Sequence, residues 1–207
     1  MKDIIFTLRN DLKEKLTPSR FEHTISVSFI CTALAMRYGC DLDKAELAGL
    51  LHDCAKPYGD QEIVVKCRKQ NIPLTEDELK APMVLHAKYG AWLAKHKYNI
   101  EDEEVLNAIR WHTTGRPEMS VLEKIVFTAD YIEPRRDKAA DLPFIRPLAF
   151  VDLDECVYQI LKGTLDYLKS KGNFVDSMSE QAYAYYKKIH EETSDAFRHT
   201  FTPGETG

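Results

Sequence analysis

The sequence of 207 residues lacks the glycine-rich motifs of the common nucleotide-binding and hydrolase folds. It contains no GxGxxG, no GxxxxGK[ST] and no GxSxG, which excludes a dinucleotide-binding turn, a P-loop and a nucleophile elbow. The zinc-protease motif HExxH is missing as well. Glycine is scarce overall, with nine residues, and this scarcity favours long helices over turn-rich β structure.

Disulfide frameworks, targeting segments and membrane spans also lack support. The five cysteines are scattered, odd in number and without a CxxC pair, a pattern typical of a reducing compartment. The start, MKDIIFTLRNDLKEKL, is amphipathic and has no apolar core followed by a cleavage site. The longest mostly apolar stretch, residues 25–36, is far shorter than the roughly 20 residues of a membrane span. We therefore expect a cytoplasmic protein without membrane contact.

Positive charge is not in excess. The chain has 33 acidic and 28 basic residues, a net charge of −5, which argues against nucleic acid as a partner. Hydrophobic residues make up 44% of the sequence, an ordinary value for a globular protein. At about 150 residues per domain, a chain of this length is expected to form one domain, or one domain with a small appendage.

Apolar residues recur at helical spacing from end to end. Phe21, Ile25, Phe29, Ala33 and Met36 form one stripe of a first helix. Similar patterns and cap signals predict further helices over 44–55, 84–96, 102–112, 121–131, 153–171 and 179–193. No alternating strand pattern exceeds four residues. The sequence therefore predicts an all-α fold.

The same pattern predicts how the domain is organised. We expect one domain over 1–195, with its functional core at about 18–136, C-terminal helices over 152–195 and a disordered tail over 196–207. Asp43 is the expected N-cap of the helix over 44–55. The apolar stripe from Leu153 to Leu168 predicts either core packing or the seam of a homodimer.

Histidines and aspartates supply the chemistry that the missing motifs do not. His23 lies on the apolar face of its predicted helix, and the doublet His52-Asp53 lies in the last turn of another. Asp130 follows Val126 by one turn and so lies beside the apolar stripe of a third helix. Such groups on separate helices are costly to bury unless something compensates them. A transition metal does so, because imidazole and carboxylate are among its preferred ligands. His86 and His112 stand at further helix ends, where side chains reach a shared cavity.

The motifs RFEHT, LLHDCAK, LHAKYGA, WHTTG and ADYIEPRR together resemble one known family. This is the YqeK family of the HD-domain superfamily of metal-dependent phosphohydrolases, whose pattern is H…HD…D. The resemblance is clear from about residue 20 to 136. It implies a helical HD-domain bundle and the activity of a symmetrical bis(5'-nucleosyl)-tetraphosphatase. Such an enzyme cleaves diadenosine tetraphosphate to two ADP by attack of a metal-bound hydroxide on a phosphoanhydride.

The resemblance also implies roles for individual residues. The primary metal ligands match His23, His52, Asp53 and Asp130, while His86 and His112 match positions for a second metal or for substrate phosphates. The ligands are expected to hold one or two divalent or trivalent transition-metal ions, iron foremost, with manganese or cobalt as alternatives. The implied substrate-binding set is His23, Asp53, His86, His112, Thr113, Asp130 and Arg136.

Asp53 and Lys56 are the expected catalytic residues. Asp53 is the expected bridging ligand if two ions bind. Lys56 shares the face of His52 one turn later, where it either neutralises a transferred phosphoryl group or is a solvated cation at the helix end. Arg20, one turn before His23, is a weaker candidate for phosphate contact.

Three alternatives stay open. The chain could be another HD-type nucleotide phosphohydrolase or phosphodiesterase, a non-haem iron oxidase, or a module that binds metal and nucleotide without cleavage. One departure bears on the nucleotide. Where the family carries I-H-P-x-T after the long C-terminal helix, this chain has Phe174, Val175, Asp176, Ser177 and Met178, a departure that bears on nucleotide preference or on how the base is held.

Overall fold

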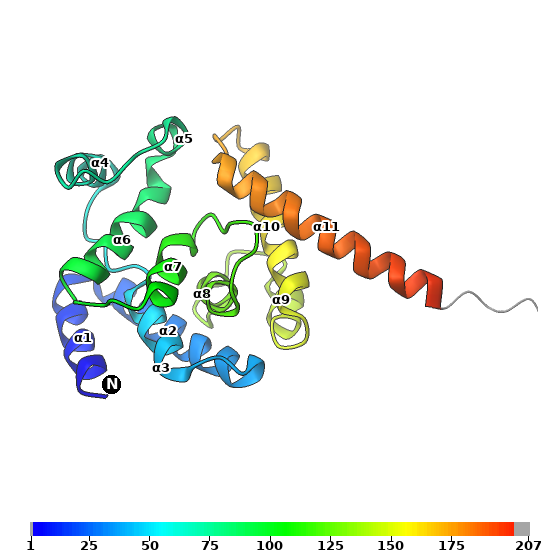
Figure 1. Ribbon diagram of the computed structural model, residues 1–207, viewed down its shortest axis with the longest axis horizontal. Coiled ribbons are helices and arrows are strands. Elements are labelled where there is room, and N and C mark those ends of the chain that lie inside the picture. Colours follow the sequence, from blue (N-terminus) through cyan, green and yellow to red (C-terminus); the bar gives the residue numbers. More distant parts are fainter. Residues whose placement is uncertain (1, 201–207) are drawn as a thin grey trace, which may run out of the picture.

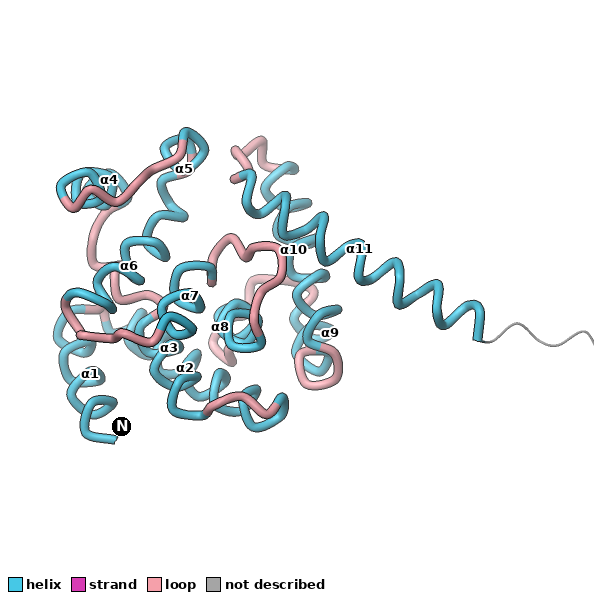
Figure 2. Tube along the Cα trace, viewed as in Figure 1, coloured by secondary structure: helices cyan, strands magenta, loops and turns pink. Residues whose placement is uncertain are grey.

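The computed structural model describes residues 2–200, with side chains described over 4–194. Over this part of the chain it consists of helices and loops, without a strand, which confirms the all-α prediction (Figures 1 and 2). The helices are α1 (Lys2–Lys15), α2 (Pro18–Tyr38), α3 (Leu42–Leu51), α4 (Asp60–Lys69), α5 (Glu76–Lys80), η1 (Pro82–Val84), α6 (Leu85–His96), α7 (Glu103–Trp111), α8 (Val121–Ile132), α9 (Leu142–Leu148), α10 (Leu153–Ser170) and α11 (Ser177–Thr200). Within the same residues, no helix has both the length and the apolar character needed to cross a membrane.

Helix α8 is the centre of the molecule. Its start is fixed by a capping box, in which the Ser120 hydroxyl accepts from the Glu123 backbone N–H and the Glu123 carboxylate accepts from the Ser120 N–H. Ile125, Val126 and Ala129 are fully buried. Helix α8 packs against α2, α3, α7, α9 and α10, so the helices that carry the candidate histidines surround it or its neighbours.

Helices α2 and α3 approach each other unusually closely. A Cβ atom added at Gly49 of α3 would lie 2.8 Å from the Ser28 Cα of α2, a distance that real Cβ atoms do not tolerate. Helix α2 ends at Gly39, whose φ of 68° is the left-handed conformation that glycine adopts without strain. The close approach brings His23 on α2 beside His52, which follows α3 directly.

The start of α3 differs from the prediction. Asp41, not Asp43, is the N-cap: its backbone is extended, and its carboxylate accepts from the Lys44 N–H at 3.0 Å. Asp43 already lies inside the first turn. Helix α3 also ends at Leu51 rather than at 55, which places the His-Asp doublet at the helix end and in the turn that follows.

Other helices were not predicted. Helix α4 has only a short apolar stripe, formed by Ile63, Val64 and Cys67. Helix α9 contains Pro143 and Pro147, residues that usually argue against a helix.

Helix α11 continues through Thr200, past the predicted end at 193, so residues 196–200 of the predicted tail are helical. Residues 201–207 of that tail lie outside the described residues.

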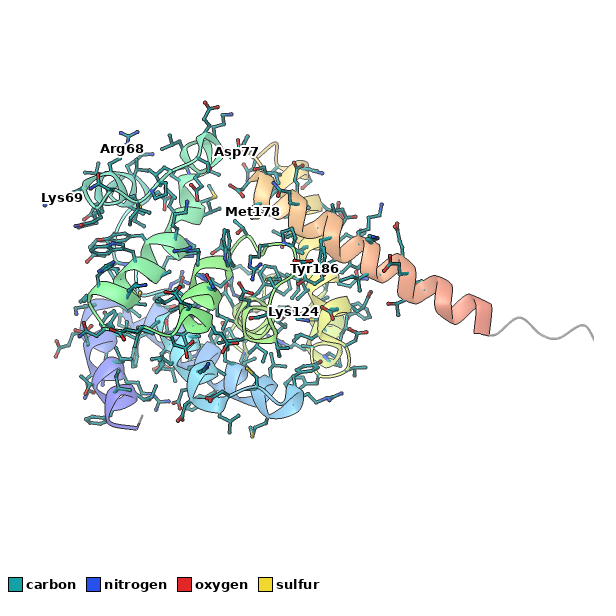
Figure 3. All side chains as sticks on the ribbon, viewed as in Figure 1. Arg68, Lys69, Asp77, Lys124, Met178 and Tyr186 are labelled. Carbon is teal, nitrogen blue, oxygen red and sulfur yellow. The ribbon has the colours of Figure 1, made fainter. Side chains whose placement is uncertain are left out.

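The C-terminal helices complete the core. The stripe from Leu153 onward is buried, apart from the half-buried Leu168 at its end, and α10 packs against α8, α9 and α11. The core-packing interpretation of that stripe is therefore correct. Tyr186 of α11 is 1% exposed, and its hydroxyl accepts from the Met119 N–H at 3.1 Å (Figure 3). This bond fixes α11 to the loop between α7 and α8.

We expect Gly49→Ala to destabilise the fold. An exposed helical glycine changed to alanine normally gains up to about 1 kcal/mol, but here the methyl group forces α2 and α3 apart, at a cost of about 1–3 kcal/mol. Chemical denaturation measures the change in the free energy of unfolding. Gly59→Ala is the control for a methyl group added in open space: Gly59 is the N-cap of α4, and a Cβ there meets nothing within 4 Å. Equal effects of the two substitutions would contradict close packing at Gly49.

Candidate metal centre

Three of the four clustered histidines have the same hydrogen-bonding arrangement. In each, Nδ1–H donates to the backbone carbonyl three residues earlier in the chain. The pairs are His52 with Gly49 at 2.7 Å, His86 with Met83 at 2.6 Å and His112 with Ile109 at 2.7 Å. Because a carbonyl can only accept, Nδ1 carries the proton, and Nε2 of a neutral ring presents a lone pair. The backbone thus fixes the tautomer that binds metals.

These lone pairs meet in a buried cluster. The Nε2 atoms of His23 and His52 lie 3.3 Å apart, and His23 Nε2 lies 3.1 Å from an Asp130 carboxylate oxygen. One ligand atom from each of these three residues lies within 4.8 Å of the others. The structure thus brings His23, His52 and Asp130 together from three segments of the chain.

Asp53 joins this group to a second one. Its Oδ2 lies 3.5 Å from His52 Nε2 and 3.7 Å from His23 Nε2. Its Oδ1 faces the other way, 3.4 Å from His86 Nε2 and 3.7 Å from His112 Nε2. The side chain is 3% exposed. One carboxylate therefore presents a separate oxygen to each histidine pair.

The donor set fits a cation. His86 Nε2 and His112 Nε2 lie 3.2 Å apart, and no proton is available between two such lone pairs if both Nδ1 atoms are protonated. Burial first, and then the neighbouring His112 and Lys56, lower the pKa of His86 to about 3 against the opposing charge of Asp53, so its ring stays neutral. Buried lone pairs facing one another repel unless a positive charge lies between them. Imidazole nitrogen and carboxylate oxygen suit first-row transition metals.

The carboxylates of the cluster stay ionised. Burial raises the pKa of Asp53 and Asp130, but the neighbouring histidines outweigh it and hold both pKa values below the ordinary range. Burial lowers the pKa of His23, and the nearby carboxylates, Asp130 first, reverse this and raise it. Negative charge thus dominates the group around His23, which attracts a proton or a metal ion to the same place.

Two further predicted residues border the second group. The Thr113 hydroxyl lies 3.1 Å from the Nε2 atoms of both His86 and His112. Lys56 Nζ lies 3.2 Å from His86 Nδ1. Since that nitrogen donates to Met83, the ammonium is a close neighbour of the ring and keeps its protons free for another acceptor.

Comparison with known proteins gives the same picture over most of the chain. The family model for the HD domain matches residues 20–135. The chain belongs to the HD domain family. A protein of Halalkalibacterium halodurans called "Bis(5'-nucleosyl)-tetraphosphatase, symmetrical" is 44% identical over 164 residues, which cover 77% of this chain and 84% of that protein. A Staphylococcus aureus protein of the same name is 38% identical over 186 residues, covering 88% and 94%.

A solved structure shares the fold. It is described as a predicted HD superfamily hydrolase involved in NAD metabolism from Clostridium acetobutylicum. It matches with a TM-score of 0.86 and 36% identity, and covers 88% of this chain and 96% of its own. The HD-domain bundle expected from the sequence is thereby confirmed.

We call the cluster of candidate ligands the HD centre; its members are His23, His52, Asp53, His86, His112 and Asp130. The sequence interpretation missed Glu133, which lies beside this centre. Its carboxylate is 2% exposed, accepts from His23 Nδ1–H at 3.1 Å and also accepts from the Arg135 N–H at 2.8 Å. It gives His23 the orientation that backbone carbonyls give the other three histidines. The signal was present, because Glu133 follows Asp130 by three residues and lies near the end of the same face of α8.

Two arginines close the HD centre on its solvent side. Arg20 donates to Asp53 Oδ2 at 2.7 Å, and Arg136 donates to Asp130 Oδ1 at 2.7 Å and to its backbone carbonyl at 3.0 Å. Both side chains are more than a third exposed, at 38% and 46%. Each guanidinium neutralises a carboxylate and retains N–H groups for an anion from outside.

A cleft of about 650 Å³ opens beside the HD centre. Its lining includes His112, Thr113 and Asp130, further residues of α8 and α10, and residues of the segment 136–141. Arg136 lies on its wall. The cleft thus connects the candidate metal ligands with space for a much larger molecule.

We expect Glu133→Gln to weaken metal binding about 10- to 100-fold, because the charged partner of His23 makes that ring a better ligand. Competition titration of Mn²⁺ measures the affinity, and circular dichroism checks that the fold is kept. Glu22→Gln is the control: Glu22 precedes His23 directly, but its carboxylate pairs with Arg135 on the exposed surface. Unchanged affinity in Glu133→Gln would contradict the role of Glu133.

Proposed function

We propose that this HD domain hydrolyses dinucleoside tetraphosphates, diadenosine tetraphosphate foremost, symmetrically to two nucleoside diphosphates. The observation that carries the proposal is the position of Asp53, with one oxygen toward each histidine pair beside a cleft. The relatives named as symmetrical tetraphosphatases support it over most of the chain.

We assign the metal ligands by the two sides of Asp53. His23, His52, Asp53 and Asp130 would hold one ion, and Asp53, His86 and His112 would hold a second. When bound, such ions supply Lewis acidity and lower the pKa of a bound water toward neutrality. Iron is our first candidate, with manganese and cobalt as alternatives that the same nitrogen and oxygen donors accept.

The chain's own residues bind and orient the phosphates. Arg136 is exposed toward the cleft and offers a planar pair of N–H donors that matches a phosphate edge. Lys56 and Thr113 line the His86 side, where an ammonium and a hydroxyl donate to phosphoryl oxygens. Positive charge held in a site with little water lowers the barrier of phosphoryl transfer. A nucleoside diphosphate is a good leaving group, so a strong general acid is not required.

The surroundings of the enzyme follow from the same proposal. Its partner is a small nucleotide and not a nucleic acid, in keeping with the net charge of −5. We place it in the cytoplasm, where nucleotides are made and five free cysteines stay reduced. A homodimer stays a prediction, and it would use a face other than the α10 stripe, which packs inside the chain.

Product analysis tests the reaction. The purified protein with iron, manganese or cobalt is incubated with diadenosine tetraphosphate, and the products are separated by anion exchange. We expect ADP as the sole product, and loss of activity with a chelator or in Asp53→Asn. ATP with AMP would keep a hydrolase and overturn the symmetrical cleavage. ADP binding without turnover under every metal would instead favour a binding module, and oxygen-dependent turnover an oxidase.

We expect Arg136→Ala to lower kcat/KM about 10- to 100-fold, the value of a hydrogen bond to a charged group. Metal content, measured by elemental analysis, should stay unchanged, because Arg136 holds a carboxylate and no metal. Arg135→Ala is the matched control, since its neighbouring guanidinium pairs with Glu22 on the surface. Loss of metal in Arg136→Ala would assign this arginine to the scaffold of the centre.

A further inference from the structure

A second carboxylate, Asp141, lies in the cleft in addition to Asp130 of the HD centre. It stands just before α9, and the Tyr131 hydroxyl donates to its two oxygens, at 2.9 and 3.1 Å. Tyr131 follows the candidate ligand Asp130 directly in α8, so the position of Asp141 is tied to the metal centre through one side chain. The cleft residue is therefore positioned, not a loosely held surface group.

Asp141 has acceptor capacity to spare. A carboxylate offers about four lone-pair sites, and one hydroxyl proton occupies part of one edge. Among the described side chains, no lysine, arginine or histidine forms an ion pair with it. An oriented carboxylate in a cleft favours a ligand that carries hydrogen-bond donors and disfavours phosphate at this point.

Gly163 keeps the approach to Asp141 open. It lies within α10, where glycine costs about 0.5–1 kcal/mol relative to alanine. A Cβ there would lie 3.2 Å from Asp141 Oδ2. An alanine at position 163 would stabilise the helix but would crowd the Asp141 carboxylate. The glycine therefore leaves Oδ2 accessible from the α10 side.

The cleft offers three kinds of surface. Arg136 is a cation, Asp141 and the Tyr131 hydroxyl are polar groups, and Ile160 and Tyr167 of α10 add apolar and aromatic surface. A ligand matched to this lining carries anionic groups, neutral hydrogen-bond donors and a flat, mostly apolar group. A nucleoside diphosphate unit carries all three.

We propose that Asp141 accepts hydrogen bonds from the 2'- and 3'-hydroxyls of one ribose of the substrate, and that this contact selects ribonucleotides. The proposal rests on the proposed function. Two vicinal hydroxyls can donate to the two oxygens of one carboxylate, and carboxylates bind ribose hydroxyls in the same way in dinucleotide-binding folds. Tyr131 is the positioning residue that holds the carboxylate, and Gly163 provides the space.

The experiment compares substrates within each variant. Hydrolysis of diadenosine tetraphosphate is measured against the analogues made from 2'-deoxyadenosine and from 3'-deoxyadenosine, with manganese-loaded protein. We expect the wild type to prefer the ribose substrate about 10- to 100-fold in kcat/KM over at least one analogue. Asp141→Asn should bring that ratio below about 3, with the analogue cleaved at nearly the wild-type rate. Gly163→Ala should reduce the ratio while the charge stays in place.

Asp137→Asn is the control for charge. This exposed carboxylate lies in the same loop and, among the described side chains, forms no hydrogen bond with Tyr131. Its removal should therefore change the attraction for a polyanion but not the ratio between substrates. A wild-type ratio near 1, or a ratio that survives Asp141→Asn, would overturn the proposal even though hydrolysis itself is confirmed.

Failure of the proposed function gives a different result. If none of the three tetraphosphates is cleaved, calorimetry of manganese-loaded protein with ADP, 2'-deoxy-ADP and 3'-deoxy-ADP decides the question. Preference for ADP that is lost in Asp141→Asn supports the ribose contact in a binding module. Equal affinity for the three diphosphates, or a preference that Asp141→Asn retains, overturns it.

Discussion

The mutual repulsion of buried lone pairs is the constraint on which the site depends. Four imidazole rings and two carboxylates meet at the junction of α2, α3, α6, α7 and α8, and most of their facing atoms can accept but not donate. Such a group is costly to bury without a cation. The rest of the fold holds these side chains together against that cost: a close α2–α3 contact, a central α8 and arginines that neutralise the carboxylates at the rim.

Histidines at helix ends stabilise the helices and fix their own tautomers by the same hydrogen bond. The last carbonyls of a helix have no partner within the helix. His52 and His112 each occupy the C-cap position and donate Nδ1–H to the carbonyl three residues back. The helix end gains a partner and the imidazole gains a fixed tautomer. Where no such carbonyl serves, as at His23, the buried Glu133 takes its place.

The sequence predicted which residues belong to the centre better than how these residues are positioned relative to one another. His23, His52, Asp53, His86, His112 and Asp130 stand out because polar residues on apolar helix faces need a reason. The two-sided position of Asp53 does not follow from spacing, because it depends on tertiary contacts between segments far apart in the chain. Glu133 was missed for a related reason: an acidic residue before Pro134 at a helix end is typical of the surface, and only the fold buries it.

The predicted helix boundaries were wrong where local sequence signals compete. Asp41 and Asp43 can each cap α3, and only the backbone conformation decides for Asp41. The two prolines of α9 suggest a loop, yet one of them opens the helix and the other is tolerated within it. The cleft could not be predicted from the sequence, because its walls come from α8, α10 and the loop that joins α8 to α9.

The bond between Tyr186 and Met119 has a consequence for how the protein is made. A chain emerges from the ribosome from its N-terminus, and its early part begins to fold first. Every candidate ligand up to Asp130 is synthesised before α10 and α11, whereas the loop that follows His112 and Thr113 receives its anchor only with Tyr186. All the candidate ligands are therefore present in the growing chain before α10, which supplies one wall of the cleft, has been synthesised.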